Sequence, residues 1–424
     1  MKFIRVNSSN IILLEQFVAQ AGKSLDSFRY FSSRPFSVIE NHLCTWVIEE
    51  DGDVKAYGHL DREGETIWLG IAVKSNSIGK GLGRIMMGRL MASASSIGLA
   101  KIKLAVDHVN EAAIKLYEQF DFQLIEKKEL FGFYEWQLPV SKQAVISSLA
   151  FAGQTAENII DVAKENNFIL EFSSGMAFSP ELEELFLNAP IKRFAHNYFP
   201  APEIPFVLNL GSGDEEIRRK SISHCVRGIQ LSFAVGAPFF SAHAGFCVDP
   251  QPAELGKELS KIASFDRAKH WHYFLASIRE VLHATLDLPT GFLLENNVLA
   301  KMNVYTNGLN PLLNVEADEM LLMIEEIADS RCGILFDTAH LKVSANTLNF
   351  NLAEATQKIL PFTRCIHHSD NDGLQDNNKP FDENYWFLPF LKQVPQSLHV
   401  LEVRKQSAAE LKGLENLLFS KIVF

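Results

Sequence analysis

Apolar and polar positions alternate in two different ways along the chain, and the change falls near residue 138. Before it, KFIRV is a short alternating segment, and HLCTWVIEEDGDVKAYGHLDREGETIWLGIAV gives successive alternating segments broken by Asp-Gly and Glu-Gly turns. Segments with helical periodicity, such as RIMMGRLMASASSIG and NEAAIKLYEQF, are inserted between them. This pattern predicts an α+β unit with a mixed, mostly antiparallel central sheet.

The second part repeats a short apolar run that ends in a polar residue and is followed by a helical segment. Eight such runs occur: VISSLAF, FILEF, RFAHN, APFFSAH, GFLLENN, GILFDTAH, RCIHHSD and SLHVLEV. Eight strands alternating with helices predict a (β/α)8 barrel, whose site lies at the C-terminal ends of the strands. We therefore expect a two-domain α/β protein with domains 1–138 and 144–424 and a linker at 139–143.

Composition and charge limit the class of protein, its expected location and its expected partners. A length of 424 residues with 47% apolar and 21% charged residues is typical of a soluble protein with more than one domain. The start of the chain does not look like a signal peptide, and five scattered cysteines suit reduced thiols in a cytoplasm. The net charge of −11 lies almost wholly after residue 140. We expect a cytoplasmic protein with no membrane or nucleic-acid partner, and a homodimer is left open.

A glycine-rich loop joins an apolar strand to a helix that begins near Arg84. The loop is Ile78-Gly79-Lys80-Gly81-Leu82-Gly83. Glycines let the backbone approach a ligand, and the N–H groups of a helix N-terminus bind anions, so the loop suits a pyrophosphate. A simple strand-to-helix turn is the alternative. The segment Asn110–Glu118 follows the loop in a second helix.

Together the loop and this second segment resemble the GNAT N-acetyltransferase family over nearly all of residues 1–138. The family's Q/R-x-x-G-x-G/A loop matches Ile78 through Gly83, although Ile78 replaces the usual Gln or Arg, and Asp121 stands where the family usually has Gly. The resemblance implies acetyl-CoA as cofactor and Tyr117 as the proton donor to the departing thiolate. It implies cofactor binding by Ile71, Val73, Ile78, Gly79, Lys80, Gly81, Leu82, Gly83 and Asn110. A packed Tyr117 without a proton-transfer role, and a fold retained without catalysis, are the alternatives.

Polar residues follow the apolar runs of the second part. They are His196, His243, Glu295, Asp337, His340, His367, Asp376 and Glu402. Each alone is compatible with a helix cap or an ion pair. Glu295 and Asp337 close very apolar strands, however, where an unpaired charge is costly. A set of oxygen and imidazole donors at one barrel mouth suits a divalent cation, namely Mn, Mg, Co or Zn.

This array resembles the xylose isomerase-like TIM barrel superfamily of sugar isomerases, sugar epimerases and apurinic-site endonucleases, over residues 144–424. The resemblance implies that Glu295, Asp337, His367 and Glu402 hold the metal, and that Glu295 and Glu402 also move protons. The family pattern H-x-S-D selects His367, not His368, as the ligand. His196, His243, His340 and Asp376 are then expected to bind substrate.

The endonuclease members carry further metals and a D-x-H element. That element falls at Asp376, and here Asn378 replaces its histidine. Together with the acidic charge, this favours a sugar or amino sugar substrate over abasic DNA. The resulting expectation is a bifunctional enzyme of amino sugar or surface polysaccharide metabolism, in which an N-acetyltransferase is joined to a metal-dependent sugar (phosphate) isomerase or epimerase. A nuclease-like barrel, a barrel that binds metal without catalysis, and an acetyl-CoA-sensing regulatory fusion are the alternatives.

Overall fold

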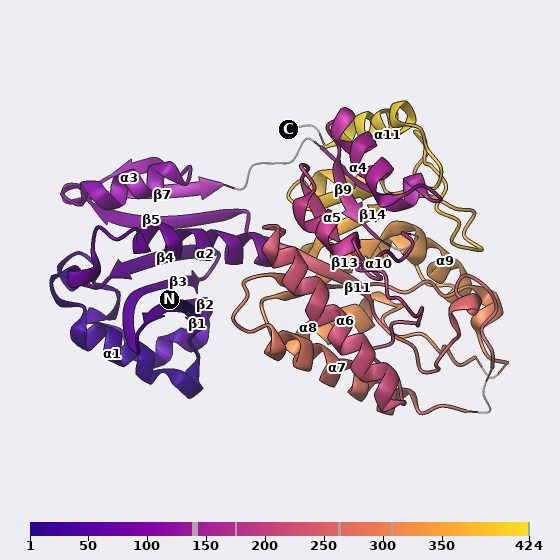
Figure 1. Ribbon diagram of the computed structural model, residues 1–424, viewed down its shortest axis with the longest axis horizontal. Coiled ribbons are helices and arrows are strands. Elements are labelled where there is room, and N and C mark those ends of the chain that lie inside the picture. Colours follow the sequence, from indigo (N-terminus) through magenta and orange to yellow (C-terminus); the bar gives the residue numbers. More distant parts are fainter. Residues whose placement is uncertain (138–142, 174–175, 262–263, 307, 423–424) are drawn as a thin grey trace. The chain divides into compact units, whose positions relative to one another are not determined.

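The computed structural model describes residues 1–137, 143–173, 176–261, 264–306 and 308–422 (Figure 1). It divides into two units, Met1–Pro139 and Val140–Phe424, which are described separately. Of the linker expected at residues 139–143, only Gln143 lies among the described residues. That part of the expectation is therefore outside what the structure describes.

The first unit is built on a seven-stranded mixed sheet with the strand order β1-β2-β3-β4-β5-β7-β6. Only the β4–β5 pair is parallel among these pairs, as predicted for a mostly antiparallel sheet. The elements are β1 (Lys2–Arg5), α1 (Ile12–Gln20), β2 (His42–Glu50), β3 (Asp53–Glu63), β4 (Thr66–Val73), α2 (Leu82–Ile97), β5 (Lys101–Asp107), α3 (Glu111–Gln119), β6 (Gln123–Lys127) and β7 (Phe131–Gln137).

The two faces of this sheet carry separate cores, because successive residues of a strand point to opposite sides. On β3, Gly58 lies against α2, since a Cβ there would come 2.8 Å from Cγ of Met86. Tyr57, the neighbouring residue, points the other way and stacks on Phe17 of α1 with ring centroids 5.9 Å apart. His59 therefore shares the α1 side of the sheet with Tyr57.

The second unit is a closed barrel of eight parallel strands, in agreement with the predicted (β/α)8 fold. Each predicted apolar run overlaps one strand, and β10 and β11 close the barrel through a parallel bridge between His196 and Ser241. The strands are β8 (Val145–Ser147), β9 (Ile169–Phe172), β10 (Arg193–Ala195), β11 (Phe239–His243), β12 (Gly291–Glu295), β13 (Cys332–Asp337), β14 (Thr363–His368) and β15 (Leu398–Leu401). The helices are α4 (Ala156–Glu165), α5 (Leu182–Asn188), α6 (Glu215–Ala234), α7 (Arg267–Ala284), α8 (Ala317–Ile327), α9 (Thr338–Leu348), α10 (Leu352–Ile359) and α11 (Ala408–Lys421).

The barrel interior is layered, with an apolar layer below a polar one. The apolar layer consists of the buried side chains Val145, Phe239, Leu293, Leu335, Cys365 and Val400. Residues i and i+2 of a strand share a face, so the next inward position on each strand lies nearer the C-terminal end of the barrel. Those positions hold polar residues, among them Ser147, Ser241, Glu295, Asp337, His367 and Glu402. The layering explains why titratable side chains gather at one end.

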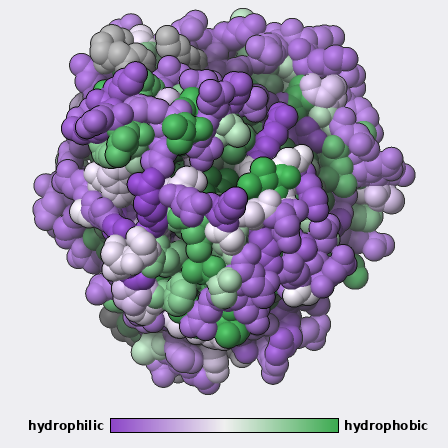
Figure 2. All heavy atoms as spheres, turned by 90° about the vertical axis from the view of Figure 1, so that its left-hand side faces the viewer, coloured by the Kyte–Doolittle hydropathy of each residue, from purple (hydrophilic) through white to green (hydrophobic). Residues whose placement is uncertain are grey.

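The surface shown in Figure 2 is predominantly hydrophilic, and its hydrophobic residues form separate patches. All five cysteines are buried free thiols, as expected from their scattered positions. In the described parts of the chain, no helix combines the length and the apolar character needed to cross a membrane.

Candidate functional sites

A cleft of about 840 Å³ opens in the first unit between the glycine-rich loop, the end of β4 and the start of α3. Of the residues predicted to bind cofactor, those that line it are Ile71, Val73, Ile78, Gly79, Gly81, Leu82, Gly83 and Asn110. Tyr117 lines it too, whereas the exposed Lys80 is not part of its wall. The structure thus brings together residues that are up to 46 positions apart in the sequence.

The glycine-rich loop has the conformation that an anion cradle needs. Gly79 and Gly81 have φ of +82° and +77°, in the left-handed region that favours glycine. No heavy atom lies within 4 Å of the place where a Cβ would stand at either residue. Gly81 is also the N-cap of α2, so the free N–H groups of the first helical turn begin here. The loop fits a pyrophosphate bound by backbone N–H groups.

Asn110 and Tyr117 also line the cleft. The side chain of Asn110 caps α3 by accepting a hydrogen bond of 3.2 Å from the backbone N–H of Ala113. Burial raises the pKa of Tyr117, so its hydroxyl keeps its proton at neutral pH and remains a donor. Asp121, in the turn after α3, has φ +63°, which explains on backbone grounds why glycine is common at this position in the family.

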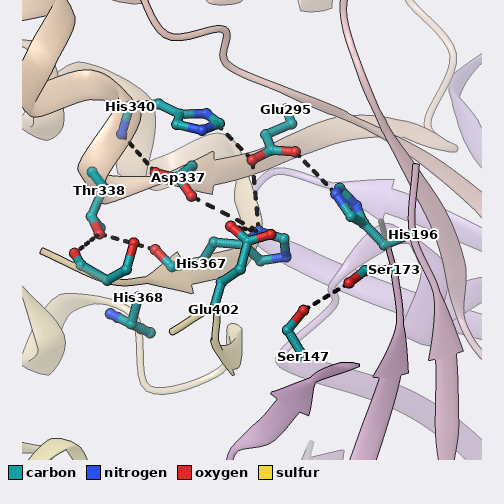
Figure 3. A network of polar contacts seen from close by, with 12 residues as sticks. Ser147, Ser173, His196, Glu295, Asp337, Thr338, His340, His367, His368 and Glu402 are labelled. Carbon is teal, nitrogen blue, oxygen red and sulfur yellow. Dashed lines mark hydrogen bonds and ion pairs between the residues drawn. The ribbon is translucent and has the colours of Figure 1, made fainter. Parts of the chain in front are cut away.

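In the second unit, the four predicted metal ligands converge at the C-terminal end of the barrel (Figure 3). Glu295, Asp337 and His367 lie on β12, β13 and β14, and Glu402 directly follows β15. One ligand atom from each of the four lies within 4.8 Å of those of the others. Glu295, Asp337 and His367 are fully buried, and the side chain of Glu402 is 12% exposed.

The atoms that face one another in this group lack hydrogen-bond partners. Both carboxylate oxygens of Glu295, Oδ2 of Asp337 and Nδ1 of His367 are buried with no such partner among the described residues. His367 Nδ1 lies 3.2 Å from Glu402 Oε2, 3.6 Å from Glu295 Oε1 and 3.9 Å from Asp337 Oδ2. Leaving buried polar atoms unpaired is costly, so a group of them aimed at one point fits a bound cation.

The pKa shifts within this group of residues also favour a bound cation. Burial raises the pKa of Asp337 well above its usual value, and the neighbouring carboxylates Glu295 and Glu402 raise it further. Burial lowers the pKa of His367, but the carboxylates of Glu171 and Glu402 outweigh this effect and raise it. Several carboxylates held this close repel one another unless a positive charge lies between them. A divalent cation with oxygen and imidazole ligands supplies that charge.

His368 does not take part in this group, as the H-x-S-D pattern predicted. Its ring lies on the other side of β14, where Nε2 is 2.9 Å from Nδ1 of His399 and Nδ1 is 3.1 Å from the hydroxyl of Tyr385. Because residues i and i+1 of a strand face opposite sides, only one histidine of the pair can point into the barrel.

His196 and His243, predicted to bind substrate, form a second group with Glu295. Nε2 of each lies 3.3 Å from Oε2 of Glu295, and their ligand atoms also lie within 4.8 Å of one another. Nδ1 of His196 is 2.9 Å from the hydroxyl of Ser241, which fixes the ring orientation. This group shares Glu295 with the first, so the residues could hold a second cation as well as a substrate hydroxyl.

His340 and Asp376 contact each other. Nε2 of His340 lies 3.3 Å from Oδ2 of Asp376, and its Nδ1 lies 3.4 Å from Oε1 of Glu295. Asn378, which stands where the nuclease pattern has histidine, is buried with φ +45°, and its carbonyl accepts a hydrogen bond from the N–H of Arg404. His340 and Asp376 therefore form an ion pair, and the amide of Asn378 is a poor ligand for zinc.

Sequence reasoning missed Glu171, which the structure places beside the metal-ligand group. Its Oε2 lies 3.0 Å from Nε2 of His367, and both side chains are buried. A carboxylate on one ring nitrogen of a histidine fixes the ring and directs the other nitrogen towards a metal. The sequence contained a signal for this position, because Glu171 in FILEF falls two positions after the inward-facing Ile169. The side chain of Glu171 therefore belongs to the polar layer of the barrel interior.

We expect Glu171→Gln to lower the affinity of the barrel for Mn²⁺ by about 10–100-fold, the usual effect of losing such a partner. Glutamine keeps the shape but removes the charge that makes Nδ1 of His367 more basic. Calorimetric titration of metal-free protein measures this, with Glu157→Gln on the exposed side of α4 as control. Equal Mn²⁺ affinity in the wild type and both variants would show that Glu171 only fills space.

The first unit thus has an open cleft with an anion cradle, and the second is a barrel with carboxylates and histidines at its C-terminal end. This combination defines a two-domain protein with an acetyltransferase-type unit and a TIM barrel unit. The chain belongs to the xylose isomerase-like TIM barrel family, whose model matches residues 131–414. Residues 12–122 match the acetyltransferase (GNAT) family.

Several solved structures are similar to parts of this chain. A D-tagatose 3-epimerase-like protein aligns with 66% of this chain and 97% of its own, at 18% identity and a TM-score of 0.51. An L-ribulose 3-epimerase aligns with 66% of this chain and 94% of its own, at 12% identity and a TM-score of 0.50. An N-acetyltransferase from Staphylococcus aureus Mu50 aligns with 32% of this chain and 98% of its own, at 20% identity and a TM-score of 0.27. Among curated proteins, none matches this sequence.

Proposed function

We propose that the chain is a bifunctional enzyme. Residues 1–138 form an acetyl-CoA-dependent N-acetyltransferase, and residues 144–424 form a divalent-metal-dependent isomerase or epimerase of a sugar or sugar phosphate. One observation carries the second half of the proposal, namely the convergence of buried ligand atoms of Glu295, Asp337 and His367, which lack hydrogen-bond partners among the described residues, with the carboxylate of Glu402. An amino sugar pathway in the cytoplasm is the setting in which both activities serve one product.

In the barrel, Glu295, Asp337, His367 and Glu402 would hold the metal, which supplies positive charge to polarise the carbonyl and hydroxyl oxygens of the sugar. Glu295 and Glu402 then move a proton off and on the carbon next to the carbonyl. The two differ in their surroundings. Glu295 is fully buried and contacts His196, His243 and His340, whereas the side chain of Glu402 is 12% exposed. Glu402 is therefore the carboxylate that meets the substrate more directly.

The exposed edge of the site indicates what kind of substrate it accepts. The side chains of His243 and Asp376 are 29% and 19% exposed, next to the buried carboxylates. Imidazole and carboxylate groups at the mouth suit the hydroxyls of a small polyhydroxylated molecule, which both donate and accept hydrogen bonds. A D-tagatose 3-epimerase-like protein and an L-ribulose 3-epimerase share the barrel fold, and this supports a sugar as substrate.

In the first unit, the cleft would hold acetyl-CoA with its pyrophosphate on the loop Gly79–Gly83. The pantetheine arm would lie along the end of β4, where Ile71 and Val73 line the wall. Tyr117 is protonated and lines the same cleft, so it can donate its proton to the thiolate that leaves. Acetyl-CoA sensing without acetyl transfer is the alternative function of the same cleft.

The proposed function is tested by metal analysis of the purified protein and by deuterium exchange. Protein loaded with Mn²⁺, Mg²⁺, Co²⁺ or Zn²⁺ is incubated in D₂O with ketohexoses, ketopentoses, their phosphates and amino sugars. We expect metal-dependent deuterium uptake at the carbon next to the carbonyl for at least one sugar, and loss of uptake after chelation. Protein that retains no metal, or loaded protein that exchanges no sugar of the panel, would contradict the barrel half of the proposal.

A nuclease is the second candidate, because the group His196–His243–Glu295 could hold an additional cation. We nevertheless expect no metal-dependent incision of an abasic duplex at nanomolar enzyme. Asn378 gives the third site no imidazole, and the acidic charge of the second domain disfavours a phosphate backbone. Gel analysis of a labelled abasic duplex with Zn²⁺- and Mn²⁺-loaded protein measures this. Efficient incision would replace the sugar with DNA as the substrate.

A further inference from the structure

A second set of buried polar side chains lies beside the metal-ligand group and reaches the outer side of β14. His368 contacts both His399 and Tyr385, as described above, and the hydroxyl of Tyr385 lies 2.5 Å from Oγ1 of Thr338. Thr338 in turn donates a hydrogen bond of 3.0 Å to the backbone carbonyl of His367 (Figure 3). The four side chains thus form one continuous chain of hydrogen bonds, which ends on the backbone of a predicted metal ligand.

These four side chains are shielded from solvent. Thr338 and His368 have no exposed surface, and Tyr385 and His399 are each 2% exposed. They come from four separate segments, namely the start of α9, the end of β14, the segment between β14 and β15, and β15 itself. A buried polar group that loses its partner costs about 1–3 kcal/mol, so a fully paired network of this kind fixes one arrangement of its segments.

The end of the chain sets the direction of every hydrogen bond in it. A backbone carbonyl can only accept, so the single hydroxyl hydrogen of Thr338 goes to His367. Tyr385 then donates to Thr338, and its oxygen accepts from the Nδ1–H of His368. Nε2 of His368 keeps a lone pair, which accepts from the Nδ1–H of His399. Removing any hydroxyl of the chain therefore leaves a neighbouring group without its donor or acceptor.

The hydroxyl of Thr338 joins the backbones that carry two of the predicted metal ligands. Thr338 directly follows Asp337, and Asp337 is paired in register with His367 between β13 and β14. Oδ1 of Asp337 is itself held, because it accepts a hydrogen bond of 2.7 Å from the N–H of His340 in the first turn of α9. Side chains that bind a metal need to be held to within about 0.5 Å of their working positions. The bond from Thr338 to the carbonyl of His367 supplies such a constraint.

We propose that Thr338 and Tyr385 are positioning residues of the metal site. The hydroxyl of Thr338 holds the ligands Asp337 and His367 in their relative positions, and Tyr385 holds that hydroxyl. This proposal rests on the proposed metal-dependent function of the barrel. The role differs from that of Glu171, which contacts the ring of His367 and not its backbone.

The test is calorimetry of metal-free, full-length protein titrated with Mn²⁺, Mg²⁺, Co²⁺ and Zn²⁺ in turn. Thr338→Val removes the hydroxyl and keeps the branched shape, whereas Thr338→Ser keeps the hydroxyl. Tyr385→Phe removes only the phenolic hydroxyl, and its ring can keep the stacking on Phe381, whose centroid lies 4.5 Å away. The control is Thr356→Val on α10, a fully buried threonine whose hydroxyl also donates to a backbone carbonyl, that of Leu352, at 2.8 Å.

We expect Thr338→Val and Tyr385→Phe to weaken binding of the tightest metal by about 10–100-fold, the usual effect of losing an outer partner of a metal ligand. Thr338→Ser should bind nearly as the wild type does, because its hydroxyl can make the same bonds. Thr356→Val should also match the wild type. Urea unfolding of the metal-free variants checks that each is folded, and Tyr385→Phe decides the question if Thr338→Val is not. Nitrogen NMR of the metal-free wild type should show the hydrogen of His368 on Nδ1.

Three affinity results would overturn the proposal: wild-type affinity in the folded variants that lack a hydroxyl, an equal loss in Thr356→Val, or a loss in Thr338→Ser as large as in Thr338→Val. A hydrogen on Nε2 of His368 in place of Nδ1 would overturn it as well, because Tyr385 would then donate to His368 and not to Thr338. A wild type that binds none of the four metals would instead contradict the proposed metal-dependent function.

Discussion

Replacing Glu402 by glutamine should reduce deuterium exchange into the best sugar substrate by about 10²–10⁴-fold, the usual size of lost general-base catalysis. Glutamine has the shape of glutamate and can coordinate a metal weakly, but it cannot accept a proton near neutral pH. The side chain of Glu402 is partly exposed and its Oε2 lies 3.2 Å from Nδ1 of His367, so it adjoins both the substrate side and the ligand group. Mass spectrometry or NMR of the sugar recovered from D₂O measures the exchange.

The same change at Glu295 separates proton transfer from metal binding. Glu295 belongs to both ligand groups and is fully buried, so Glu295→Gln should lose metal as well as exchange. Glu402→Gln should retain more of its metal, because that side chain belongs to only one group. Acetyl transfer measured by thiol release is the internal control for both variants. Ordinary exchange in both would show that these carboxylates only hold structure, whereas loss of both activities would indicate unfolding or coupled domains.

Much of the fold and of the ligand group could be predicted from the sequence, because the features that predict them are neighbours along the chain. In the barrel, the apolar run and the polar residue that closes it are adjacent in the chain, so Glu295, Asp337 and His367 are visible as strand ends. The period of two residues along a strand places His367 and His368 on opposite faces, and the family pattern H-x-S-D selected His367 as the ligand. The resemblance then assigned the four residues to one set, and the closed barrel brings them within 4.8 Å.

The parts that were missed depend on contacts between distant segments. Glu171 and His367 are 196 positions apart, and only barrel closure brings their side chains to 3.0 Å. FILEF was recognised as a strand, yet a single glutamate inside an apolar run carries no sign of its partner. The hydrogen bond from Tyr30 to Asp61 of β3 was missed for the same reason, because Tyr30 lies in a segment with no regular periodicity. Pairwise proximity of this kind is set by packing and not by local pattern.

Replacing Gly81 by aspartate should abolish most acetyl-CoA binding by the first unit. A Cβ at Gly81 meets no atom within 4 Å, so the new carboxylate would stand in the open cradle where the pyrophosphate is expected. At about 4 Å two like charges repel by about 1 kcal/mol in water and about 4 kcal/mol near a protein surface. A pyrophosphate carries more than one charge, and about 1.4 kcal/mol corresponds to a tenfold change in Kd. We expect affinity to fall by about 10²-fold or more.

Two further variants separate charge from backbone strain in this experiment. Gly81→Ala adds only a methyl group at a residue with φ +77°, so it measures the effect of strain and of a filled cradle without charge. Gly52→Asp places the same carboxylate at φ +75° in the turn between β2 and β3, where a Cβ also meets no atom within 4 Å. Calorimetry with acetyl-CoA should rank Gly52→Asp with the wild type, Gly81→Ala below it, and Gly81→Asp lowest. Wild-type affinity in Gly81→Asp would mean that the pyrophosphate does not lie on this loop, because the added charge would then be far from the ligand.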